Sequence, residues 1–80
     1  MEQGIKNRIL STMADVFELK LEDINENSTS DNTENWDSLR HMNLILSLEE
    51  EFSIRFQFDE ISEISDFNSI YKLISGKLIH

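Results

Sequence analysis

Ser38 is the residue of this sequence whose surroundings most favour chemistry. It stands between Asp37 and Leu39 at the predicted start of a helix, directly after an acidic segment and Trp36. The N-terminus of a helix offers free N–H groups and the positive end of the helix dipole, so a phosphate attached there would be stabilised. Serine is also a common helix cap, and on local spacing alone capping is the more ordinary interpretation of Ser38.

Ser38 and His41 lie three residues apart, a pairing that raises the question of hydrolysis. Two residues on one helical turn cannot readily align a serine, a histidine and an acid in a row. The sequence also lacks a glycine-rich elbow on which a nucleophile could stand. We therefore expect no hydrolytic site at this pair, with His41 an ordinary surface or partly buried histidine.

The segment 22–37 comes close to the spacing of a calcium-binding loop. The residues at positions 1, 3, 5, 9 and 12 of the EF-hand pattern are Asp23, Asn25, Asn27, Asp31 and Glu34. Ser28 stands where the sharp turn requires glycine, and polar Ser30 replaces the usual apolar anchor. No second hand accompanies the first, so we expect a solvated acidic loop without a specific metal site.

A second acidic feature is the run Glu49, Glu50 and Glu51, near the end of a helix predicted over residues 38–53. Acids near a helix C-terminus oppose the helix dipole, at a cost of roughly a few tenths of a kcal/mol each. A docking surface for a basic partner would explain the run, because complementary charge raises encounter rates. A solvated helix face also explains it, and periodicity alone favours that alternative.

The composition limits the classes of partner. The 80 residues include 16 acids against 7 lysines and arginines, for a formal charge of −9. Few cations are available to neutralise phosphates, which argues against nucleic acids and anionic membranes as partners. The chain has no cysteine, so a disulfide, a thiolate metal site and a catalytic thiol are excluded. Because the sequence shows no signal-peptide pattern and no long apolar run, we expect a soluble, cytoplasmic protein. We also expect it to be a monomer.

The elements that must position Ser38 are predicted from apolar spacing, beginning with a helix over residues 4–19. The residues on its apolar face are Ile5, Ile9, Met13, Val16 and Phe17. The acidic segment 22–37 follows as a long loop. We expect Ile24 and Trp36 to pin this loop to the helices.

The helix predicted over residues 38–53 begins with Asp37 or Ser38 as its cap. Its apolar residues are Leu39, Met42, Leu44, Ile45, Leu46, Leu48 and Phe52. Placed at 100° per residue, these side chains cover more than half of the circumference. We therefore expect a central helix with several neighbours and only a narrow solvent stripe.

An extended connector follows, in which Ile54, Phe56 and Phe58 alternate with polar residues, and we expect its aromatic side chains to plug the core. A short helix over residues 59–63 comes next, with Asp59 as its cap. Ser65 or Asp66 then caps a last helix, which Gly76 ends in a left-handed conformation. The residues on the apolar face of this helix are Phe67, Ile70, Tyr71 and Ile74.

Together these elements predict an all-α fold. It is a small four-helix bundle of three longer helices and one short helix, with a long first loop. We expect a single domain over residues 1–80, because a chain of this length allows no second one.

Two motifs occur at a distance from each other that resembles their spacing in a known protein family. Their residues are Trp36, Asp37, Ser38 and Leu39, followed by Leu44, Leu48, Glu49, Glu50, Glu51, Phe52 and Ile54. This pattern resembles the acyl carrier protein family, and the length, the acidity and the long first loop agree with it. The resemblance covers roughly residues 5–75. Its most specific part is Asp-Ser-Leu at the family's distance from Leu-Glu-Glu-Glu-Phe.

The resemblance implies that Ser38 is the attachment site of 4'-phosphopantetheine, transferred from coenzyme A by a phosphopantetheinyl transferase. The thiol of this arm would carry an acyl group as a thioester, which gives a cysteine-free chain its sulfur chemistry. The resemblance thus implies a carrier without catalytic residues of its own, which is not an enzyme. Asp37 resembles the acid associated with recognition by the transferase. Leu39 and Met42 would make apolar contacts with partner enzymes and with the base of the arm.

The remaining partner surface implied by the resemblance is acidic. Glu49 and Glu50 would face the basic docking patches of acyl-loading, condensing or acyltransferase enzymes. Arg40 and Asn43 depart from the pattern, because carriers of general fatty acid synthesis have acids at these positions. Gln57 and Phe58 likewise replace a proline before the third helix.

These departures favour a specialised carrier that serves a fatty-acid, polyketide or related biosynthetic pathway of its own. An aminoacyl or peptidyl carrier, which uses the same arm, is an alternative. An unmodified acidic helical adapter is a second alternative, from another functional class.

Overall fold

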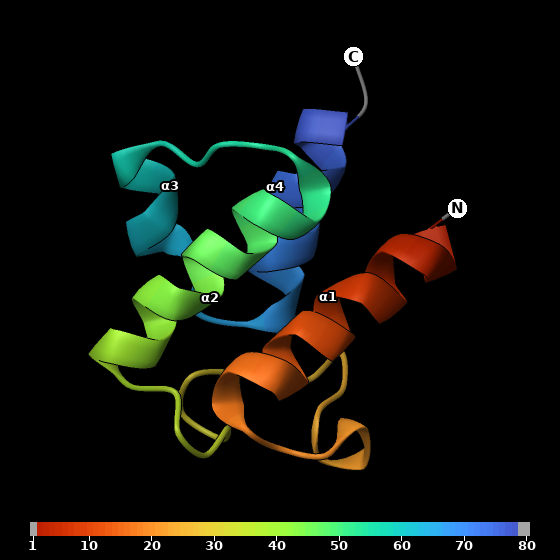
Figure 1. The fold of residues 1–80 in the computed structure, drawn as a ribbon, viewed down its shortest axis with the longest axis vertical. Coiled ribbons are helices and arrows are strands. Elements are labelled where there is room, and N and C mark those ends of the chain that lie inside the picture. The colour runs from red at the N-terminus through yellow and green to blue at the C-terminus, as the bar shows by residue number, and fades with distance from the viewer. Residues whose placement is uncertain (1, 79–80) are drawn as a thin grey trace.

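The computed structural model describes residues 2–78, and within this range the chain forms four α-helices and one 3-10 turn (Figure 1). The helices are α1 (Glu2–Phe17), α2 (Ser38–Phe52), α3 (Phe58–Glu63) and α4 (Phe67–Leu78), and the 3-10 turn η1 is Leu21–Asp23. No β-strand occurs within residues 2–78. The predicted all-α fold, with three longer helices, one short helix and a long first loop, is therefore confirmed.

The core lies where α1 packs against α2 and α4. Figure 1 shows α1 and α2 at the front of the molecule, with α4 passing behind α2. The fully buried side chains are Ile9, Met13 and Phe17 of α1, Leu44, Ile45 and Leu48 of α2, and Phe67, Ile70 and Ile74 of α4. Residues that recur every three or four positions share one face of a helix, which is why the predicted apolar faces of the first and last helices meet in the core.

The long loop between α1 and α2 is fixed at both of its predicted anchors. Ile24 is buried, and Trp36 packs partly buried against the core. Two backbone hydrogen bonds also tie the loop to the connection between α3 and α4: the Ser30 N–H to the Ser65 carbonyl (2.8 Å) and the Phe67 N–H to the Ser28 carbonyl (3.0 Å). The loop is thus part of the folded structure, although acidic side chains dominate its composition.

The ends of α1 and α2 are each closed by a left-handed residue that is not glycine. Glu18 follows α1 and Ser53 follows α2, and both have a φ angle of 56°. The next residue in each case donates its N–H back into the helix: Leu19 to the Ala14 carbonyl (2.9 Å) and Ile54 to the Glu49 carbonyl (3.1 Å). This closure ends α1 at Phe17, before the predicted boundary at residue 19.

The last helix begins as predicted and ends differently. A carboxylate oxygen of Asp66 accepts the N–H of Ser69 at 2.7 Å, so Asp66 is the cap of α4. The predicted left-handed stop at Gly76 is wrong, because α4 continues to Leu78 and no glycine has a positive φ angle. A glycine inside a helix costs only about 1 kcal/mol relative to alanine. That cost is too small to end a helix whose apolar face is buried.

Two predictions at the short helix are also wrong. Asp59 is not its cap, because α3 begins at Phe58 and Gln57 occupies the cap position. Phe58 does not plug the core, since its side chain is 89% exposed whereas that of Phe56 is buried. The alternation of the connector ends where the helix begins, and the first turn of α3 directs Phe58 into solvent.

The second helix buries less apolar surface than predicted. Its buried residues are Leu44, Ile45, Leu48 and Phe52. The side chains of Leu39, Met42 and Leu46 are exposed by 72%, 45% and 60%. These three residues are spaced i, i+3 and i+7, so they form one row on the surface of α2. The predicted narrow solvent stripe is therefore wrong, and an apolar row begins next to Ser38.

Glu60 gives the short helix a pH-dependent support. Its carboxylate accepts the N–H of Gln57 at 2.7 Å and lies 2.8 Å from the Lys77 ammonium nitrogen. The Gln57 hydrogen bond, followed by that of Lys77, lowers the pKa of Glu60 below its ordinary value, and desolvation acts weakly in the other direction. A carboxyl group with a lowered pKa in the folded state stabilises the fold above its unfolded pKa. This stabilisation is lost as the pH falls through the folded pKa.

Replacing Glu60 with Gln should therefore lower the free energy of unfolding near pH 7 by less than about 1 kcal/mol, because the ion pair is partly exposed. The difference from the unsubstituted protein should be smaller at pH 3 than at pH 7, because the stabilisation is lost as the pH falls through the lowered pKa of Glu60. Urea unfolding at the two pH values measures it. Glu63→Gln, on the same helix, is the matched control. An equal effect of Glu60→Gln at both pH values would contradict the linkage.

Candidate functional site

Ser38 is the first residue of α2, and its hydroxyl is free. The residue before it, Asp37, is extended and accepts the N–H of Arg40 on a carboxylate oxygen at 2.8 Å. Asp37 is therefore the cap of α2, and the interpretation of Ser38 as the cap is wrong. The Ser38 side chain is exposed, and within residues 2–78 its hydroxyl has no hydrogen-bond partner.

The backbone around Ser38 suits an anion. The first N–H groups of an α-helix have no acceptor within the helix, and the Asp37 carboxylate satisfies only that of Arg40. The N–H groups of Ser38 and Leu39 remain available at the positive end of the dipole of a 15-residue helix. A phosphate bonded to the Ser38 hydroxyl would lie at this end.

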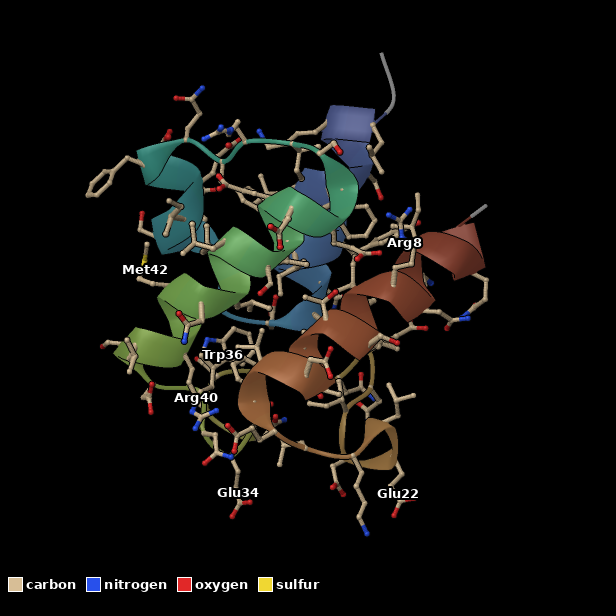
Figure 2. All side chains as sticks on the ribbon, in the orientation of Figure 1. Arg8, Glu22, Glu34, Trp36, Arg40 and Met42 are labelled. Carbon is tan, nitrogen blue, oxygen red and sulfur yellow. The ribbon has the colours of Figure 1, made fainter. Side chains whose placement is uncertain are left out.

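The start of α2 is fastened to the end of α1. Arg40 donates from Nη1 to the Val16 carbonyl (2.8 Å) and lies 3.5 Å from a carboxylate oxygen of Glu18. Asn35, with a φ angle of 68°, donates its side-chain N–H to the Phe17 carbonyl at 2.7 Å. The last turn of α1 contains no basic residue, so its carbonyl groups depend on these donors. Figure 2 shows Arg40 beside this end of α1.

Trp36 and His41 link the contact between the start of α2 and the end of α1 to α3. The Trp36 ring packs on Phe17 with centroids 4.9 Å apart, and its indole N–H donates to Nδ1 of His41 at 3.0 Å. The other ring nitrogen of His41 lies 3.1 Å from the Ile61 carbonyl oxygen. Both nitrogens of His41 are thus bonded to groups other than Ser38, which gives the histidine no free nitrogen with which to activate the serine.

An open cleft of about 480 Å³ lies beside Ser38. Its lining includes Trp36, Asp37, Ser38, His41, Met42 and Ile64. Met42 extends from α2 on the side where α3 lies, as Figure 2 shows. Of the residues predicted for partner recognition, Asp37, Leu39 and Met42 are therefore close to Ser38, and the exposed row of α2 continues from them to Leu46.

The glutamate run lies at the other end of α2, and two of its three side chains have structural partners. Glu49 accepts the N–H of Phe56 at 2.9 Å and so holds the connector against the helix. The carboxylate of Glu51 lies 2.8 Å from Arg8. Glu50 is exposed, and within residues 2–78 its carboxylate has no hydrogen-bond or ion-pair partner. Of the two glutamates predicted for partner recognition, only Glu50 is free to offer its charge.

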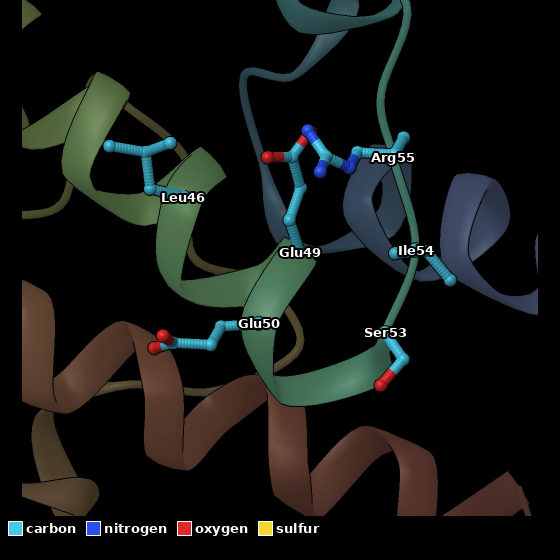
Figure 3. A pocket seen from close by; sticks show the side chains of 6 residues that line it. All are labelled: Leu46, Glu49, Glu50, Ser53, Ile54 and Arg55. Atoms are coloured by element: carbon cyan, nitrogen blue, oxygen red, sulfur yellow. The ribbon is translucent and has the colours of Figure 1, made fainter.

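A second cleft, of about 530 Å³, lies between the end of α2 and the connector that follows it. Figure 3 shows its lining residues, which are Leu46, Glu49, Glu50, Ser53, Ile54 and Arg55. It is lined by the last turns of α2 and the connector, whereas Ser38 stands in the first turn. This cleft is therefore not part of the Ser38 site.

The acidic loop folds through its own amide side chains. Asn25 accepts the N–H of Asn27 at 2.7 Å, and Asn32 accepts that of Thr29 at 2.8 Å. Among residues 2–78 no group of three or more histidines, aspartates and glutamates could hold a metal ion. In the same part of the chain, no helix has both the length and the apolarity to cross a bilayer.

Sequence reasoning missed the junction formed by Asn35, Arg40 and His41. Their partners lie 18, 24 and 20 residues away along the chain, so no local spacing could point to them. The one available signal was the lack of a basic residue in the last turn of α1, which requires donors from elsewhere.

Because Asp37 caps α2 and Ser38 does not, substitutions of these two residues should affect stability differently. Asp37→Ala should lower the free energy of unfolding by about 1 kcal/mol, the usual cost of losing a cap. Ser38→Ala should change it by less than about 0.5 kcal/mol, as for other exposed side chains. Urea unfolding measures both, with Asp31→Ala as the control for loss of an exposed acid from the same loop. A Ser38→Ala effect as large as that of Asp37→Ala would show that the serine caps the helix.

No protein-family model matches this chain, and neither does any curated protein.

Proposed function

We propose that this protein is a carrier of the acyl carrier protein type, modified at Ser38 with 4'-phosphopantetheine. The observation that carries the proposal is the exposed hydroxyl of Ser38, which the helix does not use because Asp37 provides the cap. The motif around it and the four-helix fold with a long first loop agree with the same function. The protein then needs no catalytic residue of its own.

The residues around Ser38 fit the proposed group. The N–H groups of Ser38 and Leu39 can receive the oxygens of a phosphodiester at the helix N-terminus. The adjoining cleft of about 480 Å³ offers polar and apolar contacts to the start of a flexible arm. When attached, the arm supplies the thiol that this cysteine-free chain lacks, and the acyl cargo is held on it as a thioester.

The attachment reaction makes a simple demand on this chain. A bond forms between the Ser38 oxygen and the phosphorus that bears the pantetheine in coenzyme A. The pyrophosphate bond breaks, and the nucleotide leaves with the second phosphate. The hydroxyl proton passes to a base of the transferase, since both nitrogens of His41 are already engaged. Ser38 therefore has to be exposed and its hydroxyl free of hydrogen bonds, which is how it is found within residues 2–78.

The partner surface that we propose combines the exposed apolar row of α2 with a free carboxylate near its end. Leu39, Met42 and Leu46 supply the exposed row, and Glu50 supplies the nearest free carboxylate of the glutamate run. Carboxylates at the rim would speed encounter with basic enzymes, while exposed apolar residues would provide contact area.

We further propose that this carrier serves a specialised pathway. Arg40 and Asn43 stand where the carriers of general fatty acid synthesis have acids. Arg40 turns its charge toward α1, so this position offers a partner neither an acid nor a fully exposed cation. Partner enzymes selected for dense acidic charge along α2 would find less of it here.

Intact-mass analysis tests the proposal. The protein should gain one phosphopantetheinyl group when incubated with coenzyme A and a broad-specificity transferase, and Ser38→Ala should gain none. Ser30→Ala, which removes another exposed serine that lines the same cleft, should be modified like the unsubstituted protein.

Modification of the Ser38→Ala variant would refute the site. A lack of any mass gain by the unsubstituted protein would refute the carrier proposal and leave an acidic helical adapter. Exposure of the loaded protein to fatty-acyl and aminoacyl activating enzymes would then distinguish an acyl carrier from an aminoacyl or peptidyl carrier.

The apolar row gives a second test. Leu39→Ala should lower the kcat/KM of the transferase for this protein about tenfold, the effect of losing one well-buried apolar contact at an interface. The free energy of unfolding should change little, because Leu39 is exposed. Leu21→Ala removes a similarly exposed leucine from η1 and is the matched control. Equal effects of the two substitutions on kcat/KM would contradict the proposed surface.

A further inference from the structure

His41 occupies the point where three segments meet beside Ser38. The indole N–H of Trp36, in the loop, lies 3.0 Å from its Nδ1 atom, and the carbonyl oxygen of Ile61, in α3, lies 3.1 Å from its Nε2 atom. The His41 and Trp36 rings are stacked with centroids 6.3 Å apart. Both rings also line the cleft next to Ser38. The side chain of His41 therefore connects the loop, α2 and α3 at the attachment end of α2.

The chemistry of these two partners assigns the roles of the two ring nitrogens of His41. An indole nitrogen can only donate a hydrogen bond, so Nδ1 of His41 must be the acceptor. A carbonyl oxygen can only accept, so Nε2 must carry the hydrogen. Only the neutral imidazole with its hydrogen on Nε2 makes both bonds. Protonation from solvent would place a second hydrogen on Nδ1, and two N–H groups would then face each other.

We infer that His41 is a positioning residue for the Ser38 site and acts as a proton-sensitive latch. In its neutral form it fastens the Trp36 loop and α3 to the first turns of α2. In its protonated form it keeps the bond to the Ile61 carbonyl and loses the bond to Trp36. The indole, which forms one wall of the cleft beside Ser38, is then released from α2. The effect on loading rests on the proposed function, whereas the latch itself does not.

The charged residues of α3 are Asp59, Glu60 and Glu63, and those within four residues of His41 in the chain are Asp37 and Arg40, the latter paired with Glu18. The Asp37 carboxylate accepts a backbone N–H, Arg40 pairs with Glu18, and Glu60 pairs with Lys77. Histidine is the side chain whose ordinary charge change falls between pH 5 and pH 8, and substitution of His41 is what assigns a change in Trp36 to this residue.

Trp36 is the only tryptophan of the chain, so its fluorescence observes the latch directly. Acidification from pH 8 to pH 5 should change the emission in one transition, because the indole loses its acceptor and faces an imidazolium ion. Circular dichroism should show the helices intact across the transition. His41→Gln should abolish the transition. His80→Gln, which removes the other histidine, at a position outside the described residues, should leave it unchanged.

A second measurement needs no substitution. The indole N–H proton resonance of Trp36 should be shifted downfield and protected from exchange at pH 8, and should lose both properties at pH 5. Absence of the fluorescence transition, its persistence in His41→Gln, or an unchanged indole resonance would each overturn the latch, whether or not Ser38 is ever modified.

The positioning role is tested through the rate of loading. The kcat/KM for modification of Ser38 is measured at each pH for the unsubstituted protein and for His41→Gln. The ratio of the first value to the second should fall about 3- to 10-fold between pH 8 and pH 5.5, the size expected for one hydrogen bond. Taking the ratio removes the pH dependence of the transferase itself. A constant ratio alongside a clear fluorescence transition would refute the positioning role. Loading at neither pH would refute the proposed function while the fluorescence transition upholds the latch.

Discussion

The structure depends on a junction at which the start of α2 is bonded to the end of α1. The last carbonyl groups of α1 receive their hydrogen bonds from Arg40 of α2 and Asn35 of the preceding loop, and the Trp36 ring packs on Phe17 beside them. A partly buried carbonyl that loses its donor costs about 1–3 kcal/mol, so each helix end stabilises the other. This mutual dependence fixes the position of Ser38 although the loop before it is long, polar and acidic.

At this junction the helix cap and the exposed hydroxyl are provided by two different residues. Asp37 binds the backbone of the first turn and so ends the loop and begins the helix. Ser38, one position later, has a hydroxyl that no other group in the described chain engages. A hydroxyl used as a cap would have to be withdrawn from the helix before it could accept a covalent group. Here the helix retains its cap whether or not the serine is modified.

Features set by local periodicity could be predicted from the sequence, and features set by long-range packing could not. The buried faces of α1 and α4 follow the helical period, and Ile24 and Trp36 stand out as the apolar anchors of a polar loop. The same period wrongly predicted only a narrow solvent stripe on α2, because it cannot say on how many sides a helix has neighbours. The choice between Asp37 and Ser38 as the cap depends on one backbone torsion angle. The structural role of Arg40 depends on a partner 24 residues away.

The proposed function requires that the Ser38 hydroxyl carry the covalent arm. Fragment-mass analysis of the loaded, unsubstituted protein tests it most directly, because the chain has ten serines that compete for the assignment. We expect the full phosphopantetheinyl mass on Ser38 alone. The same mass on any other serine, or its absence from Ser38 after complete exposure to coenzyme A and transferase, would contradict it.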